Sequence, residues 1–222
     1  MLSILKAYKT LWIVLFVLSI IIVSLFYKAL KPKQSLPIYQ PAMVAFDLVD
    51  STIQHQKKYH KIGNFELLNQ NGKIVNNATY KDKIYVADFF FTTCQTICPI
   101  MTNHMVELQE VFKNDDEFML LSHTVTPEID SVAQLKAYAL SKGVIDSKWN
   151  LVTGSKKHIY KLARKSYLAV KTSGNGDAYD MIHTENFMLI DKKGQIRGFY
   201  DGTNAEDIQR IISDIAILKE NG

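Results

Sequence analysis

Two cysteines separated by three residues lie between a strand-like and a helix-like stretch, and this arrangement constrains the fold more than any other feature. The apolar run Ile84–Phe91 is typical of a buried strand. After the cysteines, apolar residues recur at helical spacing at Met101, Met105, Leu108 and Phe112. Pro99 suits the first position of a helix and disfavours helical angles at the residue before it. We therefore expect Cys98 at the N-cap and Cys94 in the preceding loop.

This predicted position of the cysteines has chemical consequences. A helix N-terminus carries a partial positive charge, which favours thiolate over thiol. Two thiolates on one tight turn can chelate a soft metal ion, or they can close a disulfide, which needs Cα atoms roughly 4.4–6.8 Å apart. Two inert, buried cysteines are the alternative, but the chain has only 2 cysteines and both fall in this turn. The sequence therefore predicts a metal-binding or redox-active pair.

The residues around the cysteines resemble a known family. The segment Phe89–Pro99 follows the pattern Phe-x-Phe-Thr-x-Cys-x-x-x-Cys-Pro, which is similar to the signature of the Sco/SenC family of copper proteins of cytochrome oxidase assembly. The segment Val125–Asp130 resembles the family's Val-Asp-Pro-x-x-Asp. His183-Thr184, followed by an apolar run, resembles its Asp-His-Thr segment leading into a strand. The resemblance extends over roughly residues 62–218.

The resemblance implies a thioredoxin-like α/β fold and a copper site made by Cys94, Cys98 and His183. Thiolates select Cu(I), and imidazole also accepts Cu(II). A structural zinc site would need four protein ligands, and an iron–sulfur cluster generally needs four cysteines. The resemblance further implies a metallochaperone that supplies copper to cytochrome c oxidase subunit II or to another copper-site protein. A thioredoxin-like protein would then serve as its reductant.

Two other functions stay open at this point. The pair Cys94 and Cys98 could belong to a thiol–disulfide oxidoreductase that reduces the cysteines of a copper site in a partner protein. It could also belong to a peroxide-reducing thiol enzyme. A Cys-x-x-Cys spacing would favour oxidoreductase chemistry, whereas Cys-x-x-x-Cys with a distant histidine favours metal binding.

Four further residues bear on the predicted site. Ile182 and Thr126 stand where the family usually has Asp, and because such carboxylates orient a ligand, their absence affects the affinity of the site. Asp130 matches the second Asp of its segment and is expected either to cap a helix or to support a ligand. Asp88 resembles the buried Asp of thioredoxin. It would have a raised pKa and accept a thiol proton, unless it lies at a sheet edge bonded to the backbone.

Five histidines compete with His183 for the role of ligand. Solvated or exposed positions are expected for His55, His60 and His158. His104 lies about 240° around the predicted helix from Cys98, so the two are poorly placed to share a metal. His123 adjoins a predicted buried strand, as His183 does, and the residues alone do not separate the two. The resemblance favours His183.

The chain begins with an apolar segment. Leu11–Tyr27 has no charged residue, although a spanning helix usually needs about 20 apolar residues. A cleaved signal peptide is the alternative, but the end of the run lacks the small residues of a cleavage site. A lipoprotein is excluded because no cysteine follows the run. We expect a cytoplasmic N-terminus at 1–10 and an uncleaved transmembrane anchor at 11–27.

Charge leaves the orientation of this anchor open, because lysines flank it on both sides. Residues 1–33 hold five lysines and no acidic residue, so without them the net charge falls from +4 to −1. The basic character belongs to the membrane flank, and a nucleic-acid partner loses its main support. The resemblance implies an oxidase copper site that lies outside the bacterial inner membrane as the target, and disulfides persist in the periplasm. We therefore expect a single-pass inner-membrane protein with a periplasmic domain.

The rest of the chain predicts one α/β domain. Residues 28–61, with Pro32, Pro37 and Pro41, are expected to be a linker and lead-in, and residues 62–219 the domain. Asn71-Gly72 between apolar runs predicts a hairpin. Strands are expected at 65–68, 73–75, 84–91, 118–121, 149–152, 187–190 and 196–200, and helices at 99–113, 131–142, 155–166 and 204–219. This alternation predicts an α/β layer architecture, and its thioredoxin-like identity depends on the resemblance.

Overall fold

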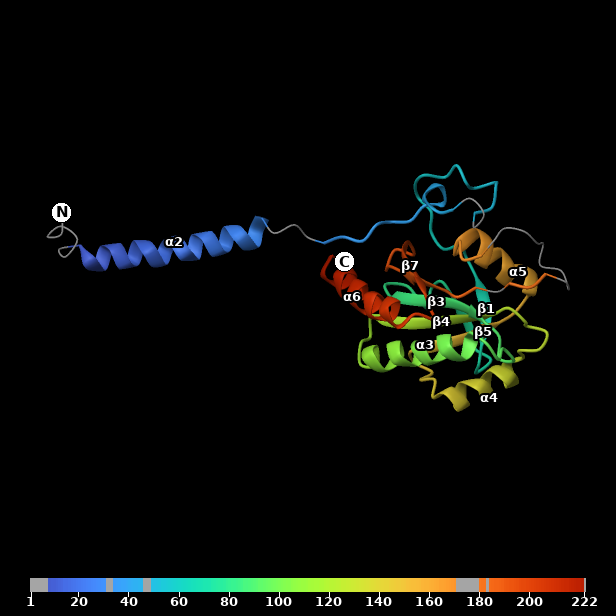
Figure 1. The fold of residues 1–222 in the computed structure, drawn as a ribbon. Helices are drawn as coiled ribbons and strands as arrows, with labels where there is room; N and C mark the ends of the chain where they lie inside the picture. The colour runs from blue at the N-terminus through green and yellow to red at the C-terminus, as the bar shows by residue number, and fades with distance from the viewer. Residues whose placement is uncertain (1–7, 31–33, 46–48, 171–179, 183, 222) are drawn as a thin grey trace. The chain divides into compact units, whose positions relative to one another are not determined.

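The computed structural model describes residues 8–30, 34–45, 49–170, 180–182 and 184–221. It separates into two compact units, Met1–Gln34 and Ser35–Gly222. The first unit contains α2, Lys9–Leu30. Its segment Lys9–Tyr27 has a mean hydropathy of 2.6 and buries nothing within the protein. By length and composition, α2 is a candidate membrane span, although a signal sequence would meet the same two criteria (Figure 1).

The second unit is built on a mixed seven-stranded sheet with the order β2-β1-β5-β4-β3-β6-β7. The strands are β1 Glu66–Asn69, β2 Ile74–Asn76, β3 Ile84–Phe90, β4 Phe118–Thr124, β5 Trp149–Thr153, β6 Asn186–Ile190 and β7 Ile196–Asp201. The three central strands β3, β4 and β5 run parallel, and the outer strands pair antiparallel. Every residue of β3 is buried, as expected for a central strand covered on both faces.

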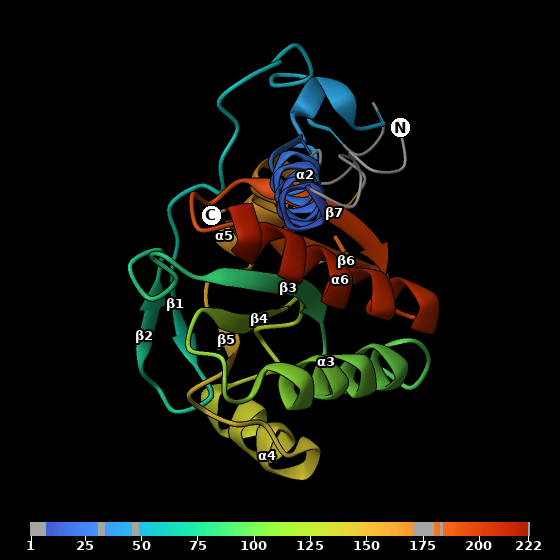
Figure 2. The ribbon, with the colours of Figure 1, turned by 90° about the vertical axis from the view of Figure 1, so that its left-hand side faces the viewer.

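Helices cover both faces of the sheet, as the alternation of elements predicted. One core contains residues of α3 Cys98–Phe112, α4 Val132–Lys142 and α6 Ala205–Asn221. The other contains residues of α5 Lys156–Lys161 and of η3 Leu162–Ser166, a short π-helical turn. Figure 1 shows α5 on the opposite side of the strands from α3 and α4, and Figure 2 shows α3 and α4 together on one side of β4.

The ends of three helices differ in detail from the prediction. Helix α3 begins at Cys98 with Ile97 as its N-cap, so the expected N-cap position of Cys98 is wrong by one residue. The Cys98 side chain packs in the core between α3 and the sheet, and packing of this kind overrides a local preference. Ser131 caps α4 and Gly143 ends it in the left-handed conformation (φ +69°), so Asp130 is not the cap. The helix expected at 155–166 is divided into α5 and the π turn.

The lead-in to the domain is more ordered than its composition predicts. The backbone N–H of Tyr39 donates to the carbonyl of Ile196 at 2.9 Å. The Arg197 guanidinium donates to the carbonyls of Leu36 (2.6 Å) and Pro37 (2.9 Å), beside β7. Residues 36–39 are therefore held against the sheet by hydrogen bonds.

His60, expected in solvent, is buried, which corrects the prediction. Its backbone N–H donates to the Gln40 side chain at 2.9 Å, and its Nε2 lies 2.8 Å from the carbonyl of Ser166. Burial lowers the pKa of His60. The prediction failed because both partners are distant in sequence.

Candidate metal centre

The two cysteines lie together where β3 leads into α3. The backbone N–H of Cys98 donates to Cys94 Sγ at 3.4 Å, and the Thr96 hydroxyl lies 3.6 Å from the same sulfur. Cys94 is half-buried, whereas Cys98, the first residue of α3, is 3% exposed and packs in the core. Both thiols are free. The strand-to-helix turn predicted from the sequence is therefore present, with one sulfur open to an incoming group and the other behind it.

The two thiols differ in acidity. Partial burial opposes ionisation of Cys94, but hydrogen bonds from the Cys98 thiol and from the backbone N–H groups of Thr96 and Cys98 outweigh it and lower the pKa of Cys94 to about 7. Burial, followed by the bond that its own thiol gives to Cys94, raises the pKa of Cys98 to about 12. The thiolate expected at the helix N-terminus thus forms on Cys94 and not on Cys98, because burial of Cys98 outweighs the helix dipole.

Asp88 lies under the same site. It is 2% exposed, on the face of β3 that packs against α3, and burial raises its pKa to about 7 while a hydrogen bond from the Ser122 side chain lowers it. Ser122 Oγ in turn accepts a hydrogen bond from Trp149 Nε1 at 2.8 Å. The negative charge of Asp88 contributes to the raised pKa of Cys98. Of the two expectations for Asp88, the buried acid is confirmed and the sheet-edge alternative is wrong.

Asp130 ties the cysteine loop to the end of β4. It accepts hydrogen bonds from the Thr92 backbone (3.2 Å), the Thr92 hydroxyl (2.5 Å) and the Thr126 hydroxyl (3.0 Å). It also accepts from the Thr124 hydroxyl. Asp130 is fully buried. Its role is therefore to hold the start of the loop that presents Cys94, and Thr126 contributes a hydroxyl to this network.

The predicted histidine ligand lies outside the described residues. The structure describes the chain on both sides of His183, and there Ile182 and Thr184 are both buried. Ile182 N–H donates to the Tyr160 hydroxyl at 3.4 Å, and the Thr184 hydroxyl donates to the Ala169 carbonyl at 3.0 Å.

The rival histidine, His123, is fully buried on the opposite face of the sheet from α3. It stacks on the ring of Phe89, with ring centroids 4.9 Å apart, and meets Tyr167 edge-on at 5.1 Å. Burial lowers its pKa to about 3. Its neighbour Phe89 belongs to the core cluster of that face, whereas Cys98 belongs to the other cluster. The structure therefore does not bring His123 to the cysteines.

The remaining histidines also lie away from the cysteine pair. His104 Nδ1 lies 2.7 Å from the Gly202 carbonyl, which agrees with its expected separation from Cys98. His158, expected to be exposed, is half-buried, because α5 packs against the sheet. Within the described ranges, no group of three or more His, Cys, Asp or Glu side chains is arranged to hold a metal ion.

Sequence reasoning missed three residues that shape the site. Ser122 and Trp149 form the chain of hydrogen bonds beneath Asp88, and Ser122 pairs with Asp88 in register across β3 and β4. Tyr138 of α4, like Cys94, packs against the core cluster that contains Cys98. Burial raises the pKa of Tyr138 to about 12, and the charge of Cys98 adds to the rise. A polar residue inside the apolar strand at 118–124 was the available signal for Ser122. No local pattern indicates Tyr138.

Comparison with known proteins places this site in a family. The family model described as SCO1/SenC matches residues 53–220. A SCO1 protein homolog of Bacillus subtilis is 34% identical over 158 residues, which cover 70% of this chain and 81% of that relative. The chain belongs to the SCO1/SenC family.

Solved SCO1/SenC structures agree with this assignment. One reports a disulfide switch in BsSco, a member of the Sco family of cytochrome c oxidase assembly proteins. It matches with a TM-score of 0.61 and 33% identity, covering 72% of this chain and 93% of that one. Another is Bradyrhizobium japonicum ScoI with copper bound, with a TM-score of 0.57 and 27% identity, covering 72% and 99%. The thioredoxin-like fold expected from the sequence is thereby confirmed.

The donor atoms of this SCO1/SenC chain suit a soft metal ion. Cys94 offers a thiolate near neutral pH at a half-buried position, and the Cys98 thiol donates a hydrogen bond to it. Adjacent thiolate sulfurs favour Cu(I) over harder divalent ions. Among the described residues, no His, Asp or Glu side chain joins these two sulfurs in a group of three, and His183 lies outside the described ranges.

Proposed function

We propose that this protein is a membrane-anchored copper metallochaperone that binds copper through Cys94, Cys98 and His183. The observation that carries the proposal is the hydrogen-bonded cysteine pair in the turn between β3 and α3, with the Cys98 N–H 3.4 Å from Cys94 Sγ and the pKa of Cys94 lowered to about 7. Membership of the SCO1/SenC family and the copper-bound structure of a relative support it. Two thiolates would hold Cu(I), and the imidazole of His183 would add affinity for Cu(II).

Metal analysis of the full-length protein tests this function. The protein is purified in detergent under anaerobic, reducing conditions and loaded with Cu(I). We expect about one copper per chain, because one pair of soft donors is present. The Cys94→Ser/Cys98→Ser variant should bind none. Wild-type protein that stays metal-free after loading would overturn the chaperone function.

The partner and the location follow from the same proposal. We infer delivery to the copper site of cytochrome c oxidase subunit II or a similar protein, with α2 in the inner membrane and the domain in the periplasm. A reversible disulfide persists better there than in the cytosol. A phosphatase fused after Gly222 should be active, and a fluorescent protein that matures only in the cytosol should stay dark. The reverse pattern would place the domain in the cytosol and contradict this role.

Thiol–disulfide exchange is a second candidate, and the unequal acidity of the two thiols favours it. The Cys94 thiolate would attack a partner disulfide and form a mixed disulfide, releasing one partner thiolate. Cys98, on losing its proton, would attack Cys94 and form the Cys94–Cys98 disulfide, releasing the second. Asp88, with a pKa near 7, is a suitable acceptor for that proton.

Trapping of the mixed disulfide tests the second candidate function. With a disulfide-bonded peptide as substrate, Cys98→Ser should accumulate the mixed disulfide and Cys94→Ser should not. Equal trapping by both variants would contradict the assigned order of attack. In the wild-type protein, mild oxidation should form the Cys94–Cys98 disulfide and block copper uptake. Uptake that persists after complete oxidation would show that redox state and metal binding are independent.

A further inference from the structure

The Tyr160 hydroxyl joins three segments that are distant in sequence. It donates to the Val125 carbonyl at 2.9 Å and lies 3.2 Å from the Asp180 carbonyl. It also accepts from the Ile182 N–H at 3.4 Å. The Val125 N–H in turn donates to the carbonyl of Phe90, the last residue of β3. Through one buried hydroxyl, the chain just before His183 is thus fastened beside the strand end that leads into the cysteine loop.

An ion pair fastens the same segment from the side of α5. Arg164 Nη2 lies 2.7 Å from Asp180 Oδ1, and both side chains are 8% exposed. The Arg164 guanidinium also lies over the ring of Tyr160, 5.4 Å from its centroid. Arg164 belongs to the π turn that follows α5, and such turns are often found at functional sites. The described part of this region therefore has two linked anchors on residues 180–182.

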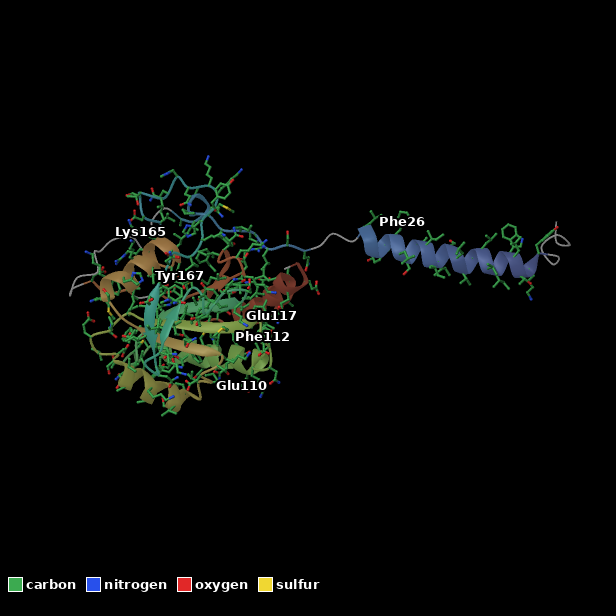
Figure 3. All side chains as sticks on the ribbon, turned by 180° about the vertical axis from the view of Figure 1, so that it is seen from behind. Phe26, Glu110, Phe112, Glu117, Lys165 and Tyr167 are labelled. Atoms are coloured by element: carbon green, nitrogen blue, oxygen red, sulfur yellow. The ribbon has the colours of Figure 1, made fainter. Side chains whose placement is uncertain are left out.

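A third anchor lies on the other side of His183. The Thr184 hydroxyl and the Asn186 side-chain amide both donate to the Ala169 carbonyl at 3.0 Å. Ala169 follows Leu168, a buried residue with φ +53°. A leucine in the left-handed region is strained, and such strain persists only where the surroundings impose it. Figure 3 shows Lys165 and Tyr167 of this stretch beside α5, and Tyr167 is fully buried whereas Lys165 is not.

We propose that the Tyr160, Arg164 and Asp180 cluster is a positioning device for His183. Tyr160 and Arg164 hold residues 180–182 on one side of His183, and the Ala169 carbonyl holds Thr184 and Asn186 on the other. The cluster can therefore position His183 without touching the metal. The inference rests on the proposed copper function. The family usually has a carboxylate at the position of Ile182; here the Asp180 carboxylate, two residues before Ile182, is paired with Arg164 and acts on His183 through the backbone between them. Ile182 itself is 3% exposed and has no polar side chain.

The chemistry makes the effect selective for oxidation state. Cu(I) is satisfied by soft thiolates, so the cysteines dominate its affinity. Cu(II) depends more on imidazole, and removing a residue that orients a metal ligand typically costs about 10- to 100-fold in metal affinity. Loosening the cluster should therefore weaken Cu(II) binding by about that factor and leave Cu(I) binding almost unchanged.

Full-length variants in detergent test the device. Cu(I) affinity is measured by competition with a colorimetric chelator, and Cu(II) binding by the thiolate-to-copper charge-transfer band. Asp180→Asn and Tyr160→Phe should each lose Cu(II) affinity and shift the band, with Cu(I) affinity retained. Arg164→Gln combined with Asp180→Asn should recover part of the loss, because two amides can restore a hydrogen bond. The control is Asp191→Asn, which breaks the Arg197–Asp191 pair (2.9 Å) and should leave both affinities unchanged.

A second background separates positioning from general stability. In a His183→Ala protein, Asp180→Asn and Tyr160→Phe should have no further effect on Cu(II), because residues that act through one group are not additive. An equal loss in both backgrounds, or a loss matched by Asp191→Asn, would overturn the inference. Wild-type protein that binds no copper, or His183→Ala that binds Cu(II) as wild type does, would instead overturn the proposed function.

Discussion

Asp88 and His123 are buried on opposite faces of the sheet, on the neighbouring strands β3 and β4, and their surroundings differ. Asp88 on β3 faces α3, with the Ser122 hydroxyl as donor and Cys98 nearby. His123 on β4 faces the α5 side and packs among the rings of Phe89 and Tyr167. In register, Asp88 pairs with Ser122 and Phe89 with His123. One residue along a strand separates a polar site from an aromatic core.

The two environments shift the pKa values of the two groups in opposite directions: that of Asp88 moves towards neutral pH and that of His123 moves away from it. Burial raises the pKa of Asp88 to about 7 and lowers that of His123 to about 3. Asp88 can therefore change protonation at neutral pH, and its charge acts on the Cys98 thiol. His123 stays neutral there, so we assign it a packing role. The distance in sequence from the cysteines does not distinguish the roles of Asp88 and His123. The face of the sheet on which each side chain lies does.

The largest expected effect separates the two faces by metal binding. Changing both cysteines to Ser should abolish copper binding, because it removes both thiolates. His123→Ala should keep the copper stoichiometry of the wild-type protein, although it leaves a cavity and lowers stability. Copper is measured by elemental analysis of the folded variants after anaerobic loading. Loss of copper in His123→Ala with the fold intact would contradict the packing role of His123.

Much of this contrast could be predicted locally. Strand, turn and helix around the cysteines follow from apolar spacing and Pro99, and an acid inside the apolar run predicted a buried Asp88 as one of two alternatives. What failed depends on contacts distant in sequence. His60 is buried against Ser166, 106 residues away. Tyr160 was missed because its hydroxyl binds residues 35, 20 and 22 positions away. The prediction of an acidic Cys98 was wrong because burial outweighs the helix dipole.

The next effect is on the pH dependence of unfolding, where Asp88 and His123 change the free energy of unfolding with opposite slopes. The folded pKa of Asp88 is about 7 against 3.8 for the unperturbed group. Its contribution is therefore fully present below about pH 4 and is lost as pH rises through 7, by up to about 4 kcal/mol. Asp88→Asn should remove this loss, so the free energy of unfolding of the variant should compare more favourably with that of the wild-type protein at pH 8 than at pH 4. Urea unfolding of the reduced full-length protein across this range measures it.

His123 has the opposite slope. Its folded pKa is about 3 against 6.5, so its contribution is present above pH 6.5 and is lost as pH falls towards 3. In the wild-type protein the two slopes oppose each other between about pH 4 and 6.5. Asp88→Asn should uncover a rise of stability with pH there, and His123→Gln a fall. Identical slopes in the two variants would refute the assignment of the groups to different environments.

A smaller effect is expected at Ser122. Ser122→Ala removes the donor to the Asp88 carboxylate, so the pKa of Asp88 should rise further. A hydrogen bond to a charged group contributes about 1.5–3 kcal/mol, and the loss should be larger at pH 8 than at pH 5, where Asp88 is protonated. Tyr80→Phe is the matched control on the other face, since it deletes a buried hydroxyl bonded to Leu120 and Asn150. Its cost should not vary with pH over this range.

The smallest effect concerns the outer end of the same chain of hydrogen bonds. Trp149 Nε1 donates to Ser122 Oγ at 2.8 Å and leaves that hydroxyl oriented to donate to Asp88. Trp149→Phe should cost about 1 kcal/mol for the lost bond, in addition to the cost of the smaller ring. The bond itself is isolated by a double-mutant cycle with Ser122→Ala, measured by urea unfolding at pH 8. If the chain operates as a unit, Trp149→Phe should cost less in the Ser122→Ala background. Equal costs in both backgrounds would mean that Trp149 only fills space, and that the polar character of this face ends at Ser122.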